Sequence, residues 1–245
     1  MSLLEAHHLG CRRLRQWVLR DVTLRIHWGE RIALLGANGS GKTTLLRALH
    51  GLQPLAEGRL NWTIPTRQAM LFQRPHLMRC SVRWQVALTF WLDKGGPWRA
   101  LSWPQALLQA RLWLQQTGWD AWQAHPAHAL SVGQRQRLAL DLALARQPQL
   151  LWLDEPTANL DPPAQRDLEQ RILQACTPAP STDPSAGLTL VFSSHHLAQA
   201  RRLASRVIYL ERGRLLADLP AAHFFGEDLS VSHPEAHAFL KGEQP

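Results

Sequence analysis

The sequence is short of cysteine and of lysine. Its three cysteines, Cys11, Cys80 and Cys176, stand far apart, with no Cys-x-x-Cys pair and no histidine at zinc spacing. This distribution argues against a disulfide framework and a metal finger, and it is typical of a reducing compartment. Only three of the 27 basic residues are lysines, so a lysine inside a glycine-rich segment, Lys42, is a candidate for a specific role.

Long apolar runs are also missing. The longest, around Val86–Leu92, falls far below the roughly 20 residues that a membrane-spanning helix requires. Met1–Arg13 has no basic start followed by an apolar stretch, so we expect no signal peptide. No internal repeat is visible, which argues against a solenoid. We therefore expect a soluble, cytosolic chain that meets a membrane only through a partner.

The composition is that of one folded domain. The chain has 245 residues, of which 45% are apolar and 19% charged, and this excludes global disorder. Its 27 basic residues against 19 acidic ones give a net charge of +8. Such a surplus suggests an anionic partner: a nucleotide, a nucleic acid or a lipid surface.

Short apolar runs that end at polar residues or glycine indicate an α/β fold. They are Arg31–Leu35, Gln68–Phe72, Leu150–Leu153 and Leu188–Phe192. Runs of this kind predict buried strands of a parallel sheet, with helices between them. The first helix is predicted at Lys42–His50, where Gly51 can end it, and a hairpin is predicted around Val207–Leu216.

The segment Pro75–Arg146 has a different character. Seven of the eleven tryptophans lie in it, and Ser102 with Gln105 forms a capping box ahead of leucines at helical spacing. We predict a helical insertion between two strands. The tryptophans are expected to pack in its core and at interfaces. Stacking on nucleic-acid bases is the alternative, although no basic and aromatic strip accompanies them.

A glycine-rich segment follows the first predicted strand and opens the first predicted helix. It reads Gly36, Ala37, Asn38, Gly39, Ser40, Gly41, Lys42, Thr43 and Thr44. Glycines let successive backbone N–H groups turn inward around phosphates, and the helix N-terminus adds partial positive charge. Lys42 can then reach the β- and γ-phosphates, and the Thr43 hydroxyl can bind Mg²⁺. The segment therefore predicts a phosphate-binding loop.

Two adjacent carboxylates end another predicted strand. Asp154 and Glu155 follow Leu150–Leu153 directly. Because successive strand residues point to opposite faces, the two can take different roles. One can hold Mg²⁺, and the other can polarise a water for attack on the γ-phosphate.

Four further features make this pattern more specific. Gln73 closes one predicted strand, and Leu130–Gln134 stands just ahead of a helix. Ala158–Asp161 follows the carboxylate pair, and His195 closes the strand at Leu188–Phe192 after two serines. With the phosphate loop and the carboxylates they make six motifs in a fixed order. In this order the sequence resembles the ATPase subunit of ABC transporters over nearly its whole length.

The resemblance implies an α/β fold of the P-loop NTPase class, ABC type. It implies a mostly parallel core sheet with flanking helices, an antiparallel β part near the N-terminus and an inserted helical subdomain. Residues 1–245 would form a single nucleotide-binding domain, with the helical subdomain at approximately residues 75–146 of a RecA-like core.

It also implies how the chain would bind ATP and Mg²⁺. Lys42, Thr43 and the backbone of residues 39–41 resemble the Walker A site. Asp154 resembles the Walker B ligand of Mg²⁺, and Glu155 resembles the general base. Gln73 resembles the glutamine that touches Mg²⁺ and reports to the membrane subunit.

The remaining motifs resemble parts of a site shared by two chains. His195 resembles the switch histidine that contacts the γ-phosphate. Ser131, Gly133 and Gln134 resemble the signature motif, which acts on ATP bound to the opposite protomer. Asp161 resembles the aspartate at the same interface. By this likeness two chains sandwich two ATP molecules head to tail, closure drives transport, and hydrolysis reopens the dimer.

Three positions depart from the family's pattern. Val132 replaces the first of the two signature glycines, while Gly133 is retained. Arg13 aligns with the aromatic residue that usually stacks on adenine. An arginine plane can also stack on a base, or Trp17 can take that place after a register shift. Asp141 followed by leucine replaces an alanine–arginine pair that is common on the signature helix.

The finer likeness is to importers. One ATPase domain without a fused membrane span resembles bacterial importers. The segments Arg67–Pro75, Phe192–His195 and Val207–Asp218 look like the ATPases of tungstate or related oxyanion uptake systems, close to the phosphate and molybdate importers. This expectation rests on likeness alone, because the ATPase never touches the cargo.

Partners and location follow from the same resemblance. We expect an integral-membrane permease, a homodimer of ATPase subunits and, indirectly, an extracytoplasmic substrate-binding protein, with no nucleic acid. The chain would then lie at the cytoplasmic face of the bacterial inner membrane. A short permease helix is expected in a groove near Pro75–Trp84, with Arg79, Arg83 or Trp84 among its contacts.

An exporter ATPase and an ATPase of DNA maintenance or translation are the alternatives. The net charge of +8 keeps the second of these open. Chromosome-type members, however, need long coiled coils, and the stretch between Lys42 and Leu130 has no heptad run. Translation-type members usually carry two ATPase modules in one chain, and this chain has one.

Overall fold

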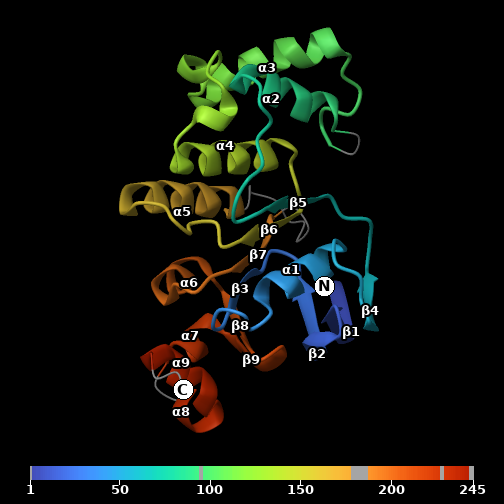
Figure 1. Ribbon diagram of the computed structural model, residues 1–245, viewed down its shortest axis with the longest axis vertical. Coiled ribbons are helices and arrows are strands. Elements are labelled where there is room, and N and C mark those ends of the chain that lie inside the picture. Colours follow the sequence, from blue (N-terminus) through green and yellow to red (C-terminus); the bar gives the residue numbers. More distant parts are fainter. Residues whose placement is uncertain (1, 94–95, 178–186, 227–228, 243–245) are drawn as a thin grey trace.

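The computed structural model describes residues 2–93, 96–177, 187–226 and 229–242. A group of helices lies at one end of the molecule, two sheets occupy the middle, and short C-terminal helices lie at the other end (Figure 1). No helix of the described residues is both long enough and apolar enough to cross a membrane.

The larger sheet has six strands. In chain order they are β3 (Arg31–Leu35), β5 (Gln68–Leu71), β6 (Leu150–Asp154), β7 (Thr189–Ser193), β8 (Arg206–Glu211) and β9 (Arg214–Pro220). Their order across the sheet is β5-β6-β7-β3-β8-β9. All neighbours are parallel except β8 and β9, which form the predicted hairpin. The prediction of a mostly parallel sheet is confirmed.

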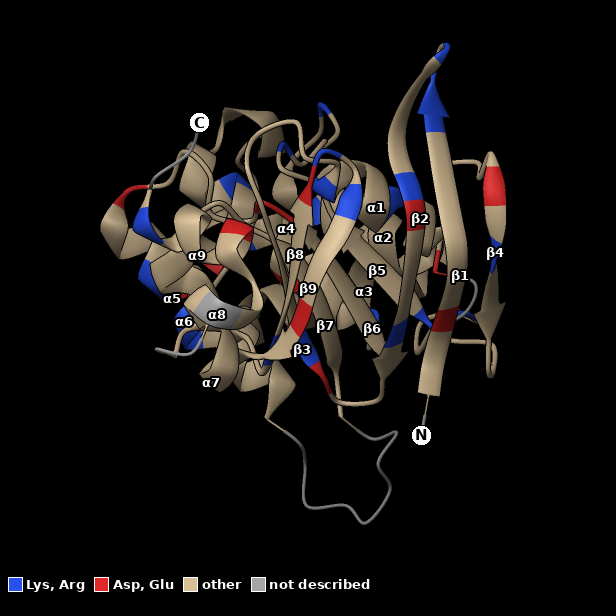
Figure 2. Ribbon diagram, turned by 90° about the horizontal axis from the view of Figure 1, so that it is seen from below, with Lys and Arg blue, Asp and Glu red and all other residues tan. Residues whose placement is uncertain are grey.

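The smaller sheet is antiparallel and lies near the N-terminus, as the family resemblance implied. It consists of β1 (Ser2–Arg13), β2 (Gln16–His27) and β4 (Glu57–Trp62), in the order β2-β1-β4. The tip of the β1–β2 hairpin is basic, because Arg12, Arg13 and Arg15 gather there (Figure 2).

Helices cover both faces of the larger sheet and close the two ends of the molecule. After β3 comes α1 (Lys42–His50), after β6 comes α5 (Pro162–Cys176), and after β7 comes α6 (Leu197–Leu203). Between β5 and β6 stand α2 (Val82–Trp91), α3 (Trp103–Thr117), two 3-10 turns (Asp120–Trp122 and Ala127–Ala129) and α4 (Val132–Ala145). The C-terminal helices are α7 (Ala221–Phe224), α8 (Leu229–Ser232) and α9 (Pro234–Lys241).

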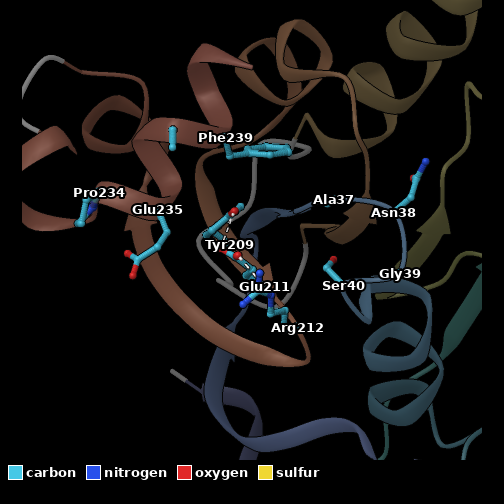
Figure 3. Close-up of a pocket in the computed structure, with 11 residues that line it drawn as sticks. Ala37, Asn38, Gly39, Ser40, Tyr209, Glu211, Arg212, Pro234, Glu235 and Phe239 are labelled. Atoms are coloured by element: carbon cyan, nitrogen blue, oxygen red, sulfur yellow. Dashed lines mark hydrogen bonds and ion pairs between the residues drawn. The ribbon is translucent and has the colours of Figure 1, made fainter. Parts of the chain in front are cut away.

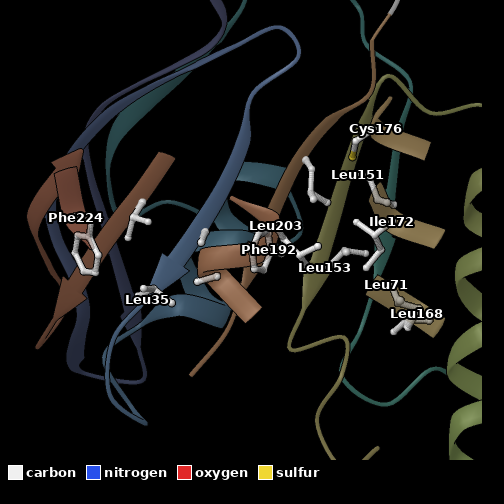
Figure 4. Packing of buried hydrophobic residues seen from close by; sticks show 14 of the residues in the cluster. Leu35, Leu71, Leu151, Leu153, Leu168, Ile172, Cys176, Phe192, Leu203 and Phe224 are labelled. Carbon is white, nitrogen blue, oxygen red and sulfur yellow. The ribbon is translucent and has the colours of Figure 1, made fainter. Parts of the chain in front are cut away.

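Strand alternation divides the apolar core into two layers. In β6, Leu151 and Leu153 face a cluster shared with α5 and α6, which Figure 4 shows. The intervening residues, Leu150 and Trp152, face the opposite cluster, which α1 and the antiparallel sheet complete. This alternation fixes the direction of the polar residue that ends the strand.

A third cluster lies among α2, α3 and α4, and it contains five of the seven tryptophans of Pro75–Arg146. Trp119 is buried, and the ring of Trp98 stacks on Phe90 at a centroid distance of 4.3 Å. The expectation of core packing holds for these residues. Trp84 and Trp91 lie outside this core: they are 48% and 47% exposed because they lie on the opposite side of α2 from its buried residues, so a place at an interface stays a prediction for them.

Candidate functional site

The glycine-rich loop joins β3 to α1. Gly36, Gly39 and Gly41 all have positive φ angles, of 147°, 82° and 108°. A Cβ atom on Gly36 would lie 2.1 Å from the carbonyl oxygen of Leu210, so only glycine fits there. The loop therefore turns tightly at the start of α1, where backbone N–H groups are free to bind an anion.

Lys42 is the first residue of α1, and its side chain folds back over the loop. Nζ donates hydrogen bonds to the carbonyl oxygens of Gly36 at 2.8 Å and Ala37 at 2.9 Å. Burial lowers the pKa of Lys42, and the carboxylates of Glu155 and Asp154 oppose that shift. The ammonium is thus held at the loop, close to where phosphates would bind.

Asp154 lies on the side of β6 that faces α1, as the position of Trp152 two residues earlier predicts. Its Oδ1 accepts hydrogen bonds from the hydroxyls of Thr43 and Ser193, each at 2.8 Å. A carboxylate and a hydroxyl placed together are ligands that suit Mg²⁺. The described residues contain no cluster of three or more His, Cys, Asp or Glu side chains that could hold a metal ion. This donor set fits Mg²⁺, which usually takes its remaining ligands from water and substrate phosphates.

Glu155, which directly follows β6, contacts residues at the ends of two further strands, β5 and β7. It has a φ of 44°, and its N–H donates to Ser193 Oγ at 2.9 Å. Its Oε2 accepts a hydrogen bond from Gln73 Nε2 at 3.0 Å, and its Oε1 lies 3.5 Å from His195 Nδ1. The loops that follow β5, β6 and β7 therefore converge on one carboxylate. A carboxylate so placed can accept a proton from a water held beside it.

Ser193 was not identified from the sequence as a site residue. It ends β7, is fully buried, and links the side chain of Asp154 to the backbone of Glu155. Its position two residues before His195, at the end of a strand neighbouring the carboxylate strand, was the available signal.

A cavity of about 330 Å³ opens over the loop. Its lining residues are Arg13, Val18, Asn38, Gly39, Gly41, Lys42, Thr43, Thr44 and Glu155. Arg13 lies at this cavity, whereas Trp17 is not among the lining residues. The Trp17 ring packs instead against the guanidinium of Arg12, 3.9 Å from the ring centroid. Of the two candidates for adenine contact, only Arg13 faces the space beside the loop.

The signature residues lie at a separate cavity of about 430 Å³. Ser131 caps α4: its Oγ accepts from the N–H of Gln134 at 3.2 Å, and its own N–H donates to Gln134 Oε1 at 2.9 Å. Gly133, Val132 and Asp161 line the same cavity. It shares no lining residue with the cavity over the glycine-rich loop, so within one chain the two sets of residues face different spaces.

A buried polar network, which the sequence analysis did not predict, lies next to the segment that contains His195. The side chain of Gln199 accepts from Ser194 Oγ at 2.8 Å and donates to Thr157 Oγ1 at 2.9 Å. It also approaches Glu169, which forms two hydrogen bonds with Arg202 at 2.8 Å and 2.9 Å. These contacts connect the segments that follow β6 and β7 through α5 and α6.

Two further hollows border the site. The first, of about 550 Å³, lies between residues 37–40 of the loop and the C-terminal part, where Tyr209 and Phe239 face it (Figure 3). The second, a groove of about 340 Å³, is lined by residues of β5, α2 and α4 together with Pro75, His76 and Leu77. Arg79, Arg83 and Trp84, which we expected at such a groove, are not among its lining residues.

Comparison with known proteins agrees with this geometry. Residues 19–158 match the family model described as ABC transporter. A nickel import ATP-binding protein, NikO of Rhodobacter capsulatus, is 38% identical over 223 residues, which cover 83% of this chain and 84% of the relative. An aliphatic sulfonates import ATP-binding protein, SsuB 1 of Pseudomonas fluorescens, is 36% identical over 218 residues, which cover 86% of this chain and 76% of the relative.

A solved structure shares the fold. It is a dimeric ATP-binding cassette in a post-hydrolysis state, bound to ADP and phosphate, and it superposes with a TM-score of 0.74. The match covers 89% of this chain and 99% of the other, at 23% sequence identity. At that identity the likeness shows the fold alone.

Proposed function

Because the chain belongs to the ABC transporter family, in which ATP hydrolysis is coupled to transport, we propose that it is the ATPase subunit of a bacterial importer. The observation that supports this best is the convergence of Gln73, Glu155 and His195 beside the glycine-rich loop. The import direction comes from the relatives, two of which are named as import proteins. We further propose that residues 75–146 act as a helical subdomain of one nucleotide-binding domain.

In this proposal the loop backbone and Lys42 bind the phosphates of ATP. The Lys42 ammonium would exchange the carbonyls of Gly36 and Ala37 for phosphate oxygens, and added negative charge would keep it protonated. Thr43, Asp154 and Gln73 would hold Mg²⁺, which supplies neutralising charge when bound. Arg13 would stack on the adenine ring.

Hydrolysis requires a water to attack the γ-phosphorus while the bond to ADP breaks. Glu155 would take the proton of that water, since it is adjacent to Asp154 and its carboxylate lies at the cavity over the glycine-rich loop. His195 and Gln73 already contact Glu155, so they would hold it in position and contact the γ-phosphate and Mg²⁺ respectively.

We also propose that two copies of the chain form the working unit. Ser131, Gly133, Gln134 and Asp161 face a cavity of their own, so they would act on ATP bound to the partner. ATP would thus bind between two chains, and hydrolysis would let them separate.

The partner in the membrane would be a permease that contacts the groove at Pro75, His76 and Leu77. This groove directly follows Gln73 in the chain, so movement of Gln73 with the γ-phosphate would reach it. The chain would then lie at the cytoplasmic face of the inner membrane, and an extracytoplasmic binding protein would deliver cargo to the permease.

For the cargo we propose tungstate or a related oxyanion. Support comes from the likeness of Arg67–Pro75, Phe192–His195 and Val207–Asp218 to the ATPases of such systems. A sulfonate-importing relative also handles an oxygen-rich anion. Nickel is the second candidate, because a nickel import protein is 38% identical to this chain.

The test measures the uptake of tungstate, nickel and sulfate by cells that make this protein. Cells carrying Lys42→Ala should bind and hydrolyse less ATP through this chain, and should lose tungstate uptake while nickel and sulfate uptake stay normal. Cells carrying Arg59→Ala, an exposed arginine of β4, serve as the matched control. Loss of nickel uptake with normal tungstate uptake would replace the oxyanion with nickel, and no change in any uptake would overturn the importer.

A further inference from the structure

The outer side of α2 and α3 exposes an unusual number of large apolar side chains. Trp84 is 48% exposed, Trp91 47%, Leu108 57% and Leu112 42%. We call Trp84 and Trp91, together with the ring of Trp103 that lies between them, the α2–α3 face. They lie at the end of the molecule where α2 and α3 stand in Figure 1. Aromatic groups gathered in this way indicate an interaction surface.

Side-chain contacts show that the two tryptophans belong to one surface. Trp103 of α3 lies between them, with ring centroids 5.2 Å from Trp84 and 5.7 Å from Trp91. On α3, Leu108 and Leu112 share the side of the helix that is turned away from Trp103, because nine residues, or two and a half turns, separate Trp103 from Leu112; they are therefore not part of this face. The opposite sides of both helices are already filled by the buried cluster that includes Phe90 and Leu114. The exposed residues are thus not needed for the core.

The charge around this face has one sign. Between Arg74 and Trp119 the sequence contains a single acidic residue, Asp93. Asp93 is only 2% exposed and is paired with Arg146 at 3.3 Å. The exposed charged residues in the described part of this stretch are all arginines: Arg74, Arg79, Arg83, Arg99 and Arg111. Arg83 is next to Trp84 in α2, so it borders the α2–α3 face.

We propose that the α2–α3 face rests on an anionic lipid surface. Tryptophan is favoured at the boundary between water and lipid because its ring is apolar and its N–H is polar. Arginine can extend its guanidinium to lipid phosphates while its stem covers apolar surface. An exposed apolar side with a basic border is the pattern of helices that lie in the membrane interface.

The position of this face also favours lipid as the occupant, on the basis of the proposed function. One side of α2, at Gln85 and Thr89, lines the groove assigned to the permease. Trp84 and Trp91 lie farther around the same helix and do not line that groove. A permease helix seated in the groove would hold α2 at the membrane, with the α2–α3 face beside the permease. A lipid surface supplies continuous negative charge to match the exposed arginines of this stretch.

The experiment measures binding of the isolated full-length chain to vesicles, without permease. Vesicles of phosphatidylcholine mixed with phosphatidylglycerol are compared with vesicles of phosphatidylcholine alone. We expect binding to the mixed vesicles and much weaker binding to the neutral ones. The Trp84→Gln/Trp91→Gln variant should bind the mixed vesicles at least about tenfold more weakly. Arg83→Gln should weaken binding about fivefold.

Matched controls change similar residues elsewhere. Leu52→Gln, at a leucine that is 53% exposed after α1, is the control for the double tryptophan variant. Arg59→Gln, at an exposed arginine of β4, is the control for Arg83→Gln. Neither control should reduce vesicle binding. Brominated lipid should quench the tryptophan fluorescence of the unchanged chain more than that of the Trp84→Gln/Trp91→Gln variant, since these rings would touch lipid.

Three results would overturn the proposal. They are no binding to mixed vesicles, equal binding to neutral and mixed vesicles, and unchanged binding by the double tryptophan variant. If that variant loses self-association while its vesicle binding is unchanged, a second copy of the chain covers the face instead. A chain that binds vesicles as expected but supports no uptake would overturn the importer function and leave the lipid contact standing.

Discussion

Replacing Asp141 tests how the helical part is fixed to the rest of the molecule. Asp141 lies on α4 and is 7% exposed. It accepts hydrogen bonds from Trp119 Nε1 at 2.8 Å and from an Arg171 guanidinium nitrogen at 3.1 Å, and Arg137 Nε lies 3.8 Å away. Arg171 belongs to α5, and Trp119 follows the end of α3. The Asp141 carboxylate therefore joins α4 and the segment after α3 to α5 of the core.

Asp141→Leu should destabilise the chain by about 2–4 kcal/mol. Losing the carboxylate leaves the buried Trp119 N–H without its acceptor, at a cost of about 1–3 kcal/mol. Arg171 keeps Asp167 as a partner at 3.2 Å and is 27% exposed, so it adds only about 1 kcal/mol. Asp141→Asn retains an acceptor for Trp119 and should stay within about 1 kcal/mol of the unchanged chain.

The difference in stability between the unchanged chain and Asp141→Asn should depend on pH. Burial raises the pKa of Asp141, although Trp119, Arg171 and Arg137 act in the opposite direction. A carboxyl whose pKa is higher in the folded state favours folding most when it is protonated. The unchanged chain should therefore lose stability relative to Asp141→Asn as the pH rises from 3.8 through the raised pKa.

Thermal and urea unfolding, followed by tryptophan fluorescence, measure these differences. Asp167→Asn is the control, because Asp167 is the other partner of Arg171 but is 49% exposed. It should cost at most about 1 kcal/mol. If Asp141→Leu costs no more than Asp167→Asn, the buried carboxylate does not hold the two parts together.

Two further changes test the nucleotide cavity and the network behind it. Arg13→Ala should weaken ATP binding by roughly 2- to 30-fold in a fluorescence titration, with poor discrimination between ATP and GTP before and after the change. Unchanged affinity there, with a large loss for Trp17→Ala, would move the adenine contact to Trp17. Gln199→Leu removes the bonds to Ser194 and Thr157 and should cost about 1–3 kcal/mol in urea unfolding. A cost below that of Gln170→Leu, at an exposed glutamine of α5, would show that this network contributes nothing.

The sequence predicted the sheet and the loop well because both follow from local rules. The strand starting at Arg31 and the helix Lys42–His50 have the predicted bounds, since an apolar run, a glycine loop and Gly51 mark them directly. One strand, predicted at Leu188–Phe192, occurs at Thr189–Ser193. The shift brings in Ser193, whose hydroxyl is buried through contacts with another strand rather than by its neighbours in sequence.

The features that the sequence analysis missed depend on contacts between residues far apart in the chain. Nothing near Asp141 in the chain indicates that Trp119 and Arg171 meet it. Likewise, Trp84 is apolar in an apolar helix, and only the packing of Val82, Val86 and Phe90 on the other side leaves it exposed. From the sequence we expected a groove near Pro75–Trp84, and α2 does line one there, but with Gln85 and Thr89 rather than with Trp84.

The most direct test of the shared ATP site is the behaviour of Glu155→Gln in ATP and Mg²⁺. The substitution keeps the shape of the side chain and its contact to Gln73 but removes its ability to take a proton. We expect unchanged ATP binding, turnover reduced about 10²–10⁴-fold, and a dimer held by ATP in light scattering. Near-normal turnover would place the base elsewhere, and a slow variant that remains monomeric with bound ATP would contradict a site formed by two chains.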